Sequence, residues 1–133
     1  MAGKPVIADN VETFVPRVRM MEPRRVRCAF RAGESTFYPY IDEVVRIQAR
    51  RNYSEDFVTS GSFTVREVLV SLERRLAQFG FFRVQRSSII NLGHVVEIRR
   101  EGRGRYAIVL SDGSSVTVPP SVRDRVEQLL AGA

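Results

Sequence analysis

The chain has 133 residues, enough for one domain around one core and too few for two. Apolar residues make up 44% of it and charged residues 27%, and no apolar run approaches the roughly 18 residues of a membrane span, so the composition argues against a disordered or membrane-spanning chain. The net charge of +6 makes a polyanion a candidate partner. Of the 21 basic residues, 20 are arginine, which suits bidentate contacts to phosphate or guanine, although a GC-rich genome would produce the same bias.

The first 25 residues are expected to form an arm or a linker. They hold three of the six prolines and no periodic apolar pattern. The start of the chain also lacks the sustained apolar stretch of a secretory signal, so the default expectation is a cytoplasmic protein. The sequence thus predicts an arm over 1–25 and a single domain over 26–131.

A strand is predicted directly after this arm. Val26, Cys28 and Phe30 alternate with polar or small residues, which is the period-two pattern of a half-buried strand, and Gly33 ends it. Cys28 is expected to be a small buried hydrophobe. Because Cys28 and His94 are the single cysteine and the single histidine of the chain, a zinc site built from such ligands would lack partners. No metal or other cofactor is expected.

The clearest predicted element is an amphipathic helix over about 64–79. Thr64 and Glu67 have the spacing of a capping box, and Gly80 stands where a left-handed C-cap is wanted. The apolar stripe of the helix, at positions i, i+3, i+4, i+7 and i+11, consists of Val65, Val68, Leu69, Leu72 and Leu76.

Short apolar segments separated by turns follow the predicted helix and indicate a β-meander. The glycines within 101–105 and 111–114 supply the positive φ that hairpin turns require. Pro119 and Pro120 end the last strand, and a short amphipathic helix is expected over about 121–131.

One motif, FFRVQRSSIINL at 81–92, mixes polar groups with large apolar residues. The apolar positions would anchor a loop from which Gln85, Arg86 and Ser87 point outward. Arginine and glutamine are the side chains able to read guanine and adenine edges bidentately, so these positions are candidates for contact with bases.

The other polar groups near this motif are expected to serve the protein itself. Arg83 is expected to pair with a carboxylate such as Glu67 or Glu73. Asparagine readily bonds the backbone of its neighbours, so Asn91 is interpreted as a turn residue. His94, which precedes an apolar strand, is expected to be structural or exposed rather than a ligand.

The pattern F-x-R-[apolar]-[HQ]-R-S, followed by a short apolar stretch, N-L and H-[apolar], resembles the LytTR family of bacterial DNA-binding domains. In this chain it reads FFRVQRSSIINLGHV over 81–95. The segment DEVVRIQA at 42–49 looks like a strand of that family, NY at 52–53 like the pair that follows it, and DG at 112–113 like the opening of its final segment. The resemblance covers roughly 26–131.

The resemblance implies a mainly β fold, in which elongated antiparallel sheets stack as a β-β-β sandwich with a central helix and a short C-terminal helix. It also implies sequence-specific binding of duplex DNA as a bacterial transcriptional regulator, through loops inserted into successive major grooves. No catalytic step is expected, so the chain is not interpreted as an enzyme. Such domains usually follow a receiver or sensor domain, and the chain is expected to be a stand-alone or excised version.

Residue by residue, the resemblance places Arg86 and Ser87 on the DNA-facing Arg-Ser position of the family and the loop around 52–54 on a second contact region. Arg123 is expected to act in a third region. The predicted DNA-binding residues are Gln85, Arg86, Ser87, Arg50, Arg51, Asn52, Ser54, Arg123 and Arg125.

Two departures from the family pattern keep a second hypothesis open. Pro119 and Pro120 fall on the family's third contact region, and proline offers neither a guanidinium nor a backbone N–H. Glu55 and Asp56 follow the second region, where carboxylates would repel phosphates. The alternative is therefore a LytTR-fold protein-interaction module with weak or lost DNA binding.

The partners expected on the leading hypothesis are double-stranded DNA with direct-repeat sites and, as further candidates, a second copy of the chain or a sensor or receiver protein. No membrane contact is expected.

Overall fold

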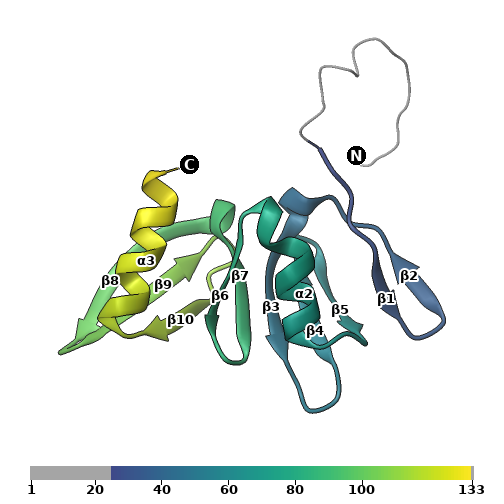
Figure 1. Ribbon diagram of the computed structural model, residues 1–133, viewed down its shortest axis with the longest axis horizontal. Helices are drawn as coiled ribbons and strands as arrows, with labels where there is room; N and C mark the ends of the chain where they lie inside the picture. The colour runs from purple at the N-terminus through teal and green to yellow at the C-terminus, as the bar shows by residue number, and fades with distance from the viewer. Residues whose placement is uncertain (1–24, 133) are drawn as a thin grey trace, which may run out of the picture.

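The computed structural model describes residues 25–132, and it is mainly β (Figure 1). The predicted arm over 1–25 therefore lies, except for Arg25, outside the described residues. The helical elements are the 3-10 turn η2 (Ile41–Glu43), α2 (Leu69–Leu76), the 3-10 turns η3 (Ala77–Phe79) and η4 (Leu92–His94), and α3 (Pro120–Ala131). The strands are β1 (Phe30–Ala32), β2 (Ser35–Phe37), β3 (Val44–Ala49), β4 (Ser54–Val58), β5 (Gly61–Val65), β6 (Phe81–Gln85), β7 (Ser88–Asn91), β8 (Val95–Gly102), β9 (Arg105–Leu110) and β10 (Ser115–Val118).

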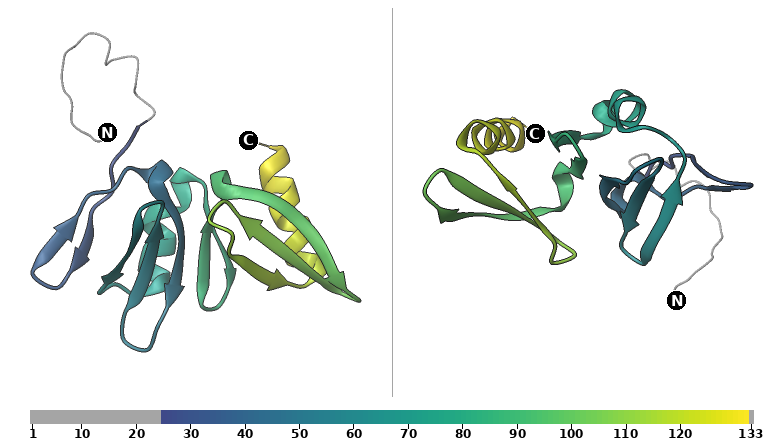
Figure 2. Two further views of the ribbon diagram at one scale, coloured as in Figure 1. Left: turned by 180° about the vertical axis from the view of Figure 1, so that it is seen from behind. Right: turned by 90° about the horizontal axis from the view of Figure 1, so that it is seen from below.

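The strands form three antiparallel sheets that follow one another along the long axis of the molecule (Figure 1). The central sheet has the order β5-β4-β3-β7-β6, with the β1-β2 hairpin on one side of it and the sheet β10-β9-β8 on the other. Seen from below, α2 and α3 lie on the same side of the sheets (Figure 2). The predicted fold class, mainly β with a central and a C-terminal helix, is confirmed. Within 25–132 neither α-helix is long and apolar enough to cross a membrane.

Strands β3 and β7 of the central sheet carry buried side chains on both faces. On one face Ile47 and Ile89 pack in a cluster with the leucines of α2. On the other face Val45 and Ile90 pack against Ile108 and other side chains of the β8–β10 sheet and α3. This burial explains why the central strands read as nearly continuous apolar runs rather than as a strict alternation.

Helix α2 is shorter than the sequence indicates, because strand pairing takes the residues expected at its start. Thr64 lies in β5, opposite Glu55 of β4, so the predicted capping box with Glu67 does not form. The helix begins after Val68, which is exposed and gives no side-chain cap. The rest of the stripe is confirmed, since Leu69, Leu72 and Leu76 are all buried. The left-handed glycine is confirmed too, at Gly80 with φ of 86°.

The first predicted strand is also shorter than expected. The ladder with β2 begins only at Phe30, and before it Arg27 makes a single bridge with Tyr40. Cys28 and Phe30 are buried as predicted, whereas Val26 is exposed.

The predicted turns of the C-terminal half are confirmed. The β8–β9 turn contains Gly104 with φ of 69°, a left-handed conformation that other residues rarely adopt. Helix α3 begins at Pro120. Proline suits a first helical position because a backbone N–H there would have no acceptor within the helix, so its absence costs nothing.

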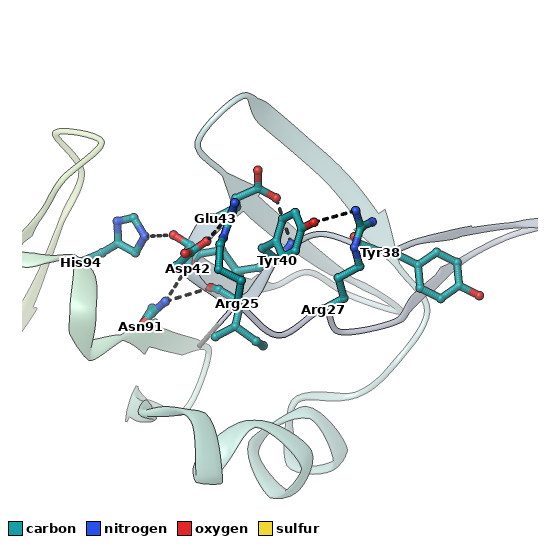
Figure 3. A network of polar contacts seen from close by, with 10 residues as sticks. Arg25, Arg27, Tyr38, Tyr40, Asp42, Glu43, Asn91 and His94 are labelled. Atoms are coloured by element: carbon teal, nitrogen blue, oxygen red, sulfur yellow. Dashed lines mark hydrogen bonds and ion pairs between the residues drawn. The ribbon is translucent and has the colours of Figure 1, made fainter. Parts of the chain in front are cut away.

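A buried asparagine at the end of β7 and the histidine three residues later, in η4, are tied to η2 and the start of β3 (Figure 3). The amide of Asn91 donates to the carbonyls of Val44 and Ile41, at 2.8 and 3.2 Å, and its oxygen accepts from the Gly93 N–H at 3.0 Å. His94 Nε2 donates to the Asp42 carbonyl at 2.7 Å. Both residues are thus structural, as predicted.

Replacing Asn91 with alanine should destabilise the fold by about 2–3 kcal/mol, because it leaves the buried Val44 carbonyl without its donor. Urea unfolding at neutral pH measures this difference. Asn52→Ala is the matched control, since Asn52 is exposed and its loss should change the free energy of unfolding by less than about 0.5 kcal/mol. Equal effects of the two substitutions would contradict the structural role of Asn91.

Candidate nucleic-acid interface

The turns that carry most of the predicted DNA-binding residues lie along one edge of the molecule. Figure 1 shows the β3–β4 turn, the β6–β7 turn and the beginning of α3 at the lower edge, while the described chain begins and ends at the upper edge. The turns of β3–β4 and β6–β7 are neighbours because β3 pairs directly with β7, and the Ala49 N–H donates to the Ser87 carbonyl at 2.8 Å. Two of the three predicted contact regions are therefore adjacent.

Arg86 is held on a braced turn with its own side chain exposed. The guanidinium of Arg83 donates to the Arg86 carbonyl at 2.6 Å and pairs with Glu73 at 3.3 Å. This confirms the predicted Arg83–Glu73 pair and gives it a function in the turn. Among residues 25–132, the Arg86 guanidinium has no hydrogen-bond partner or ion pair, so it is free to meet a ligand.

Gln85 is exposed but engaged. Its amide nitrogen donates to the Thr117 carbonyl at 2.8 Å, and its oxygen accepts weakly from the Ser88 hydroxyl at 3.4 Å. Gln85 therefore ties the β6–β7 turn to the end of β10, and it would have to release Thr117 to read a base with its amide.

The β3–β4 turn holds one paired and one unpaired arginine. Arg50 donates through two nitrogens to one carboxylate oxygen of Glu55, at 2.8 and 3.2 Å. These bonds, together with one from Ser62, hold the pKa of Glu55 below its usual value. Arg51 and Asn52, both exposed, have no polar partner for their side chains within the described part of the chain.

Ser54, predicted to contact DNA, is buried, with 1% of its surface exposed. It is the first residue of β4, opposite Val65, and its hydroxyl lies 3.4 Å from the Glu67 carbonyl, to which it donates. The alternation of the strand turns Ser54 toward the core. Its position supports the turn from beneath and does not present the hydroxyl to a ligand.

The same alternation buries Asp56, so the expectation that Glu55 and Asp56 both face phosphates is wrong. Asp56 is fully buried, and neither carboxylate oxygen has a hydrogen-bond partner among the described residues. Burial and, to a smaller extent, the neighbouring Glu67 raise its pKa to about 8, against the opposing effect of Arg75. At neutral pH the Asp56 carboxyl is therefore mainly protonated, and it adds no charge to the surface.

Glu67 lies at the centre of a polar cluster beside Asp56. Burial alone would raise the pKa of Glu67, but hydrogen bonds from Arg75 and Ser71 lower it. Arg75 donates to both carboxylate oxygens and to the Ala29 carbonyl, at 3.0 Å. Through Arg75 of α2, the cluster thus ties the segment before α2 to the segment before β1. Sequence reasoning missed it because the spacing of Glu67 from Thr64 indicated a capping box.

The third predicted region is only partly available. The Arg123 guanidinium is paired with Asp124 at 2.7 Å and lies 4.1 Å from the ring centre of Tyr106. Arg125 does not lie beside Arg123, because it lines an apolar hollow with Leu92 and Leu129. The structure therefore brings together the first two regions but leaves little free charge on the first turns of α3.

The comparisons with known proteins agree with this fold. Residues 34–131 match the family model of the LytTr DNA-binding domain, and the chain therefore belongs to the LytTR family. A solved structure, the LytTr DNA-binding domain of a putative methyl-accepting/DNA response regulator from Bacillus cereus, superposes with a TM-score of 0.66 at 19% identity, covering 80% of this chain and 97% of that one. At this level of identity the likeness shows the fold.

Curated relatives are longer than this chain. The sensory transduction protein LytT of Bacillus cereus is 33% identical over 69 residues, which are 52% of this chain and 28% of that protein. LytT of Oceanobacillus iheyensis is 25% identical over 118 residues, which are 89% of this chain and 41% of that protein. The chain thus spans less than half the length of either relative.

Replacing Asp56 with asparagine should stabilise the protein at neutral pH. The carboxyl titrates near pH 8 in the folded state and near pH 4 when unfolded, so the folded state binds a proton that the unfolded state has lost, and stability falls as pH rises across this window. An amide does not ionise. The free energy of unfolding of Asp56→Asn should therefore exceed that of the native protein by roughly 2–4 kcal/mol at pH 7 and by much less at pH 4.

Urea unfolding at pH 4, 6 and 8 measures this dependence. Glu55→Gln is the contrasting variant: the pKa of Glu55 is lowered in the folded state, so its contribution is present above its unfolded pKa and is lost as pH falls, and its replacement should destabilise the protein at pH 7. A difference between Asp56→Asn and the native protein that does not vary with pH would contradict the buried, protonated carboxyl.

Proposed function

We propose that this domain binds duplex DNA sequence-specifically, as part of a bacterial transcriptional regulator, by placing the β6–β7 and β3–β4 turns in successive major grooves. Membership of a family of DNA-binding domains supports DNA as the ligand. The observation that carries the assignment of the surface is the unpaired guanidinium of Arg86 on a braced turn, beside the unpaired Arg51 and Asn52.

The side chains of the two turns have the chemistry that base recognition needs. An arginine can donate two hydrogen bonds to guanine, and an asparagine can pair bidentately with adenine. On this proposal Arg86 reads one groove, and Arg51 and Asn52 read the next, with Ser87 beside Arg86. Because Arg50 is bound to Glu55 and Gln85 to Thr117, these two residues position the turns.

The braces explain how a short turn can be specific. Arg83 fixes the Arg86 carbonyl, and Ala49 fixes the Ser87 carbonyl, so the turn is ordered before DNA arrives. A preorganised turn loses less conformational entropy on binding than a mobile one, and more of the contact energy contributes to affinity.

The alternative, a protein-interaction module, has lost one of its two supports. The charge of Glu55 is offset by Arg50, and Asp56 is buried. Neither carboxylate therefore presents a free negative charge that would repel a phosphate. Only Pro119 and Pro120 still motivate it. Binding to direct repeats by two copies, and a sensor or receiver protein as a partner, remain parts of the proposal that rest on the family resemblance.

Arg86→Ala should weaken binding to the preferred site by about 1–3 kcal/mol, roughly 5- to 150-fold, and relax the base preference at one position. The site is first obtained by selection from random duplex DNA, and the affinities are then measured by fluorescence anisotropy at fixed salt. Arg74→Ala removes the same charge from an exposed position on the last turn of α2, away from the lower edge, and should change affinity little. If Arg86→Ala retained native affinity and native preference, the assigned contact would be wrong.

A further inference from the structure

The β8–β9 hairpin carries three exposed arginines that nothing in the described structure neutralises. Arg100, Arg103 and Arg105 are all exposed, and none has a hydrogen-bond partner or an ion pair among residues 25–132. By contrast, Arg99 of the same hairpin lies between two carboxylates, 3.2 Å from Glu97 and 3.3 Å from Glu101. Glu97 and Glu101, the acidic side chains of this hairpin, are thus both paired with Arg99, and the three other arginines leave the tip positively charged.

These arginines lie at the same edge as the candidate interface. Figure 1 shows the β8–β9 turn at the lower edge, beyond the beginning of α3 from the β6–β7 turn. Arg100 is the register partner of Tyr106, so their side chains share one face of the sheet, and the guanidinium of Arg123 lies 4.1 Å from the Tyr106 ring centre. Arg100 therefore lies on the face of the sheet that carries Arg123, while Arg103 and Arg105 lie at the tip of the hairpin.

The two turns are connected through direct contacts. Gln85, at the β6–β7 turn, donates to the Thr117 carbonyl of β10, and β10 pairs with β9, which in turn pairs with β8. The backbone of the β8–β9 hairpin is consequently held in position relative to the β6–β7 turn that carries Arg86. A duplex bound at Arg86 and continuing along this edge would bring its backbone to the hairpin.

The region between the two turns cannot supply this contact itself. Pro119 and Pro120 have no N–H and no charge to offer a phosphate. Arg123 is paired with Asp124 and lies 3.8 Å from Glu127, so its charge is largely offset. Free positive charge at this end of the interface is found on the hairpin.

We infer that Arg100, Arg103 and Arg105 form a phosphate-contact site for duplex DNA, which extends the interface beyond the β6–β7 turn and replaces a contact that Pro119 and Pro120 cannot make. The inference rests on the proposed function. Because the hairpin presents its guanidinium groups on an exposed tip, without a side-chain brace such as the one that Arg83 gives the Arg86 turn, the site contributes affinity and orientation but not base preference.

The test is the salt dependence of binding by the double variant Arg103→Ala/Arg105→Ala. Each phosphate contact contributes about 0.9 to the slope of log K against log salt concentration, so the loss of two should reduce the slope by roughly 1.8. Affinity should fall several-fold for the selected site and for an unrelated duplex alike, and the selected sequence should be unchanged. Arg74→Ala is the charge control, and circular dichroism checks the fold.

A second arm shortens the duplex on the side of the hairpin. Removing the flanking base pairs should weaken binding of the native protein clearly more than binding of the double variant, since the variant keeps only Arg100 to reach those phosphates. A double variant with the native salt slope and the native response to shortening would overturn the inference while leaving the proposed function intact. If the native protein formed no salt-sensitive complex with any duplex, both would fail.

Discussion

The pairing of β3 with β7 holds the two turns of the candidate interface side by side. The pair Gln48 with Ser88 at the end of this ladder stands where β3 enters one turn and β7 leaves the other, so antiparallel pairing alone makes the two turns neighbours. Both strands are buried on both faces, and Ile47 and Ile89 are fully covered. A slip of one residue would turn apolar side chains to the wrong face, so the register, and with it the spacing of the two turns, is strongly fixed.

The arginines divide into those that build the protein and those that remain free. Arg75 and Arg83 are tied to carboxylates and backbone carbonyls, and each holds a segment next to the interface. Arg51 and Arg86 lie on the turns thus supported and have no polar partner among residues 25–132. A net charge of +6 therefore says little about the partner until the paired charges are set aside. Of the arginines left unpaired within 25–132, Arg51 and Arg86 lie on the two turns and Arg100, Arg103 and Arg105 lie on the β8–β9 hairpin.

Much of the fold could be predicted from the sequence, because apolar periodicity and glycine turns report it directly. Leu72 and Leu76 marked the core face of α2, and the glycines marked the hairpin turns. The start of α2 could not be predicted, since the pairing of Thr64 with β4 is a long-range contact that overrides a local capping signal. The local sequence indicates that Ser54 and Asp56 are exposed, because polar residues usually are; their burial follows only from the register of β4.

The most direct test of the account is a map of the amide signals that shift in NMR spectra when duplex DNA is added to the isotopically labelled protein. We expect the perturbed amides to lie in the β3–β4, β6–β7 and β8–β9 turns, around Asn52, Arg86 and Arg103. The opposite edge, around Phe79 and Gly93, should be unchanged. Shifts concentrated at Phe79 and Gly93, with the three turns unaffected, would contradict the account.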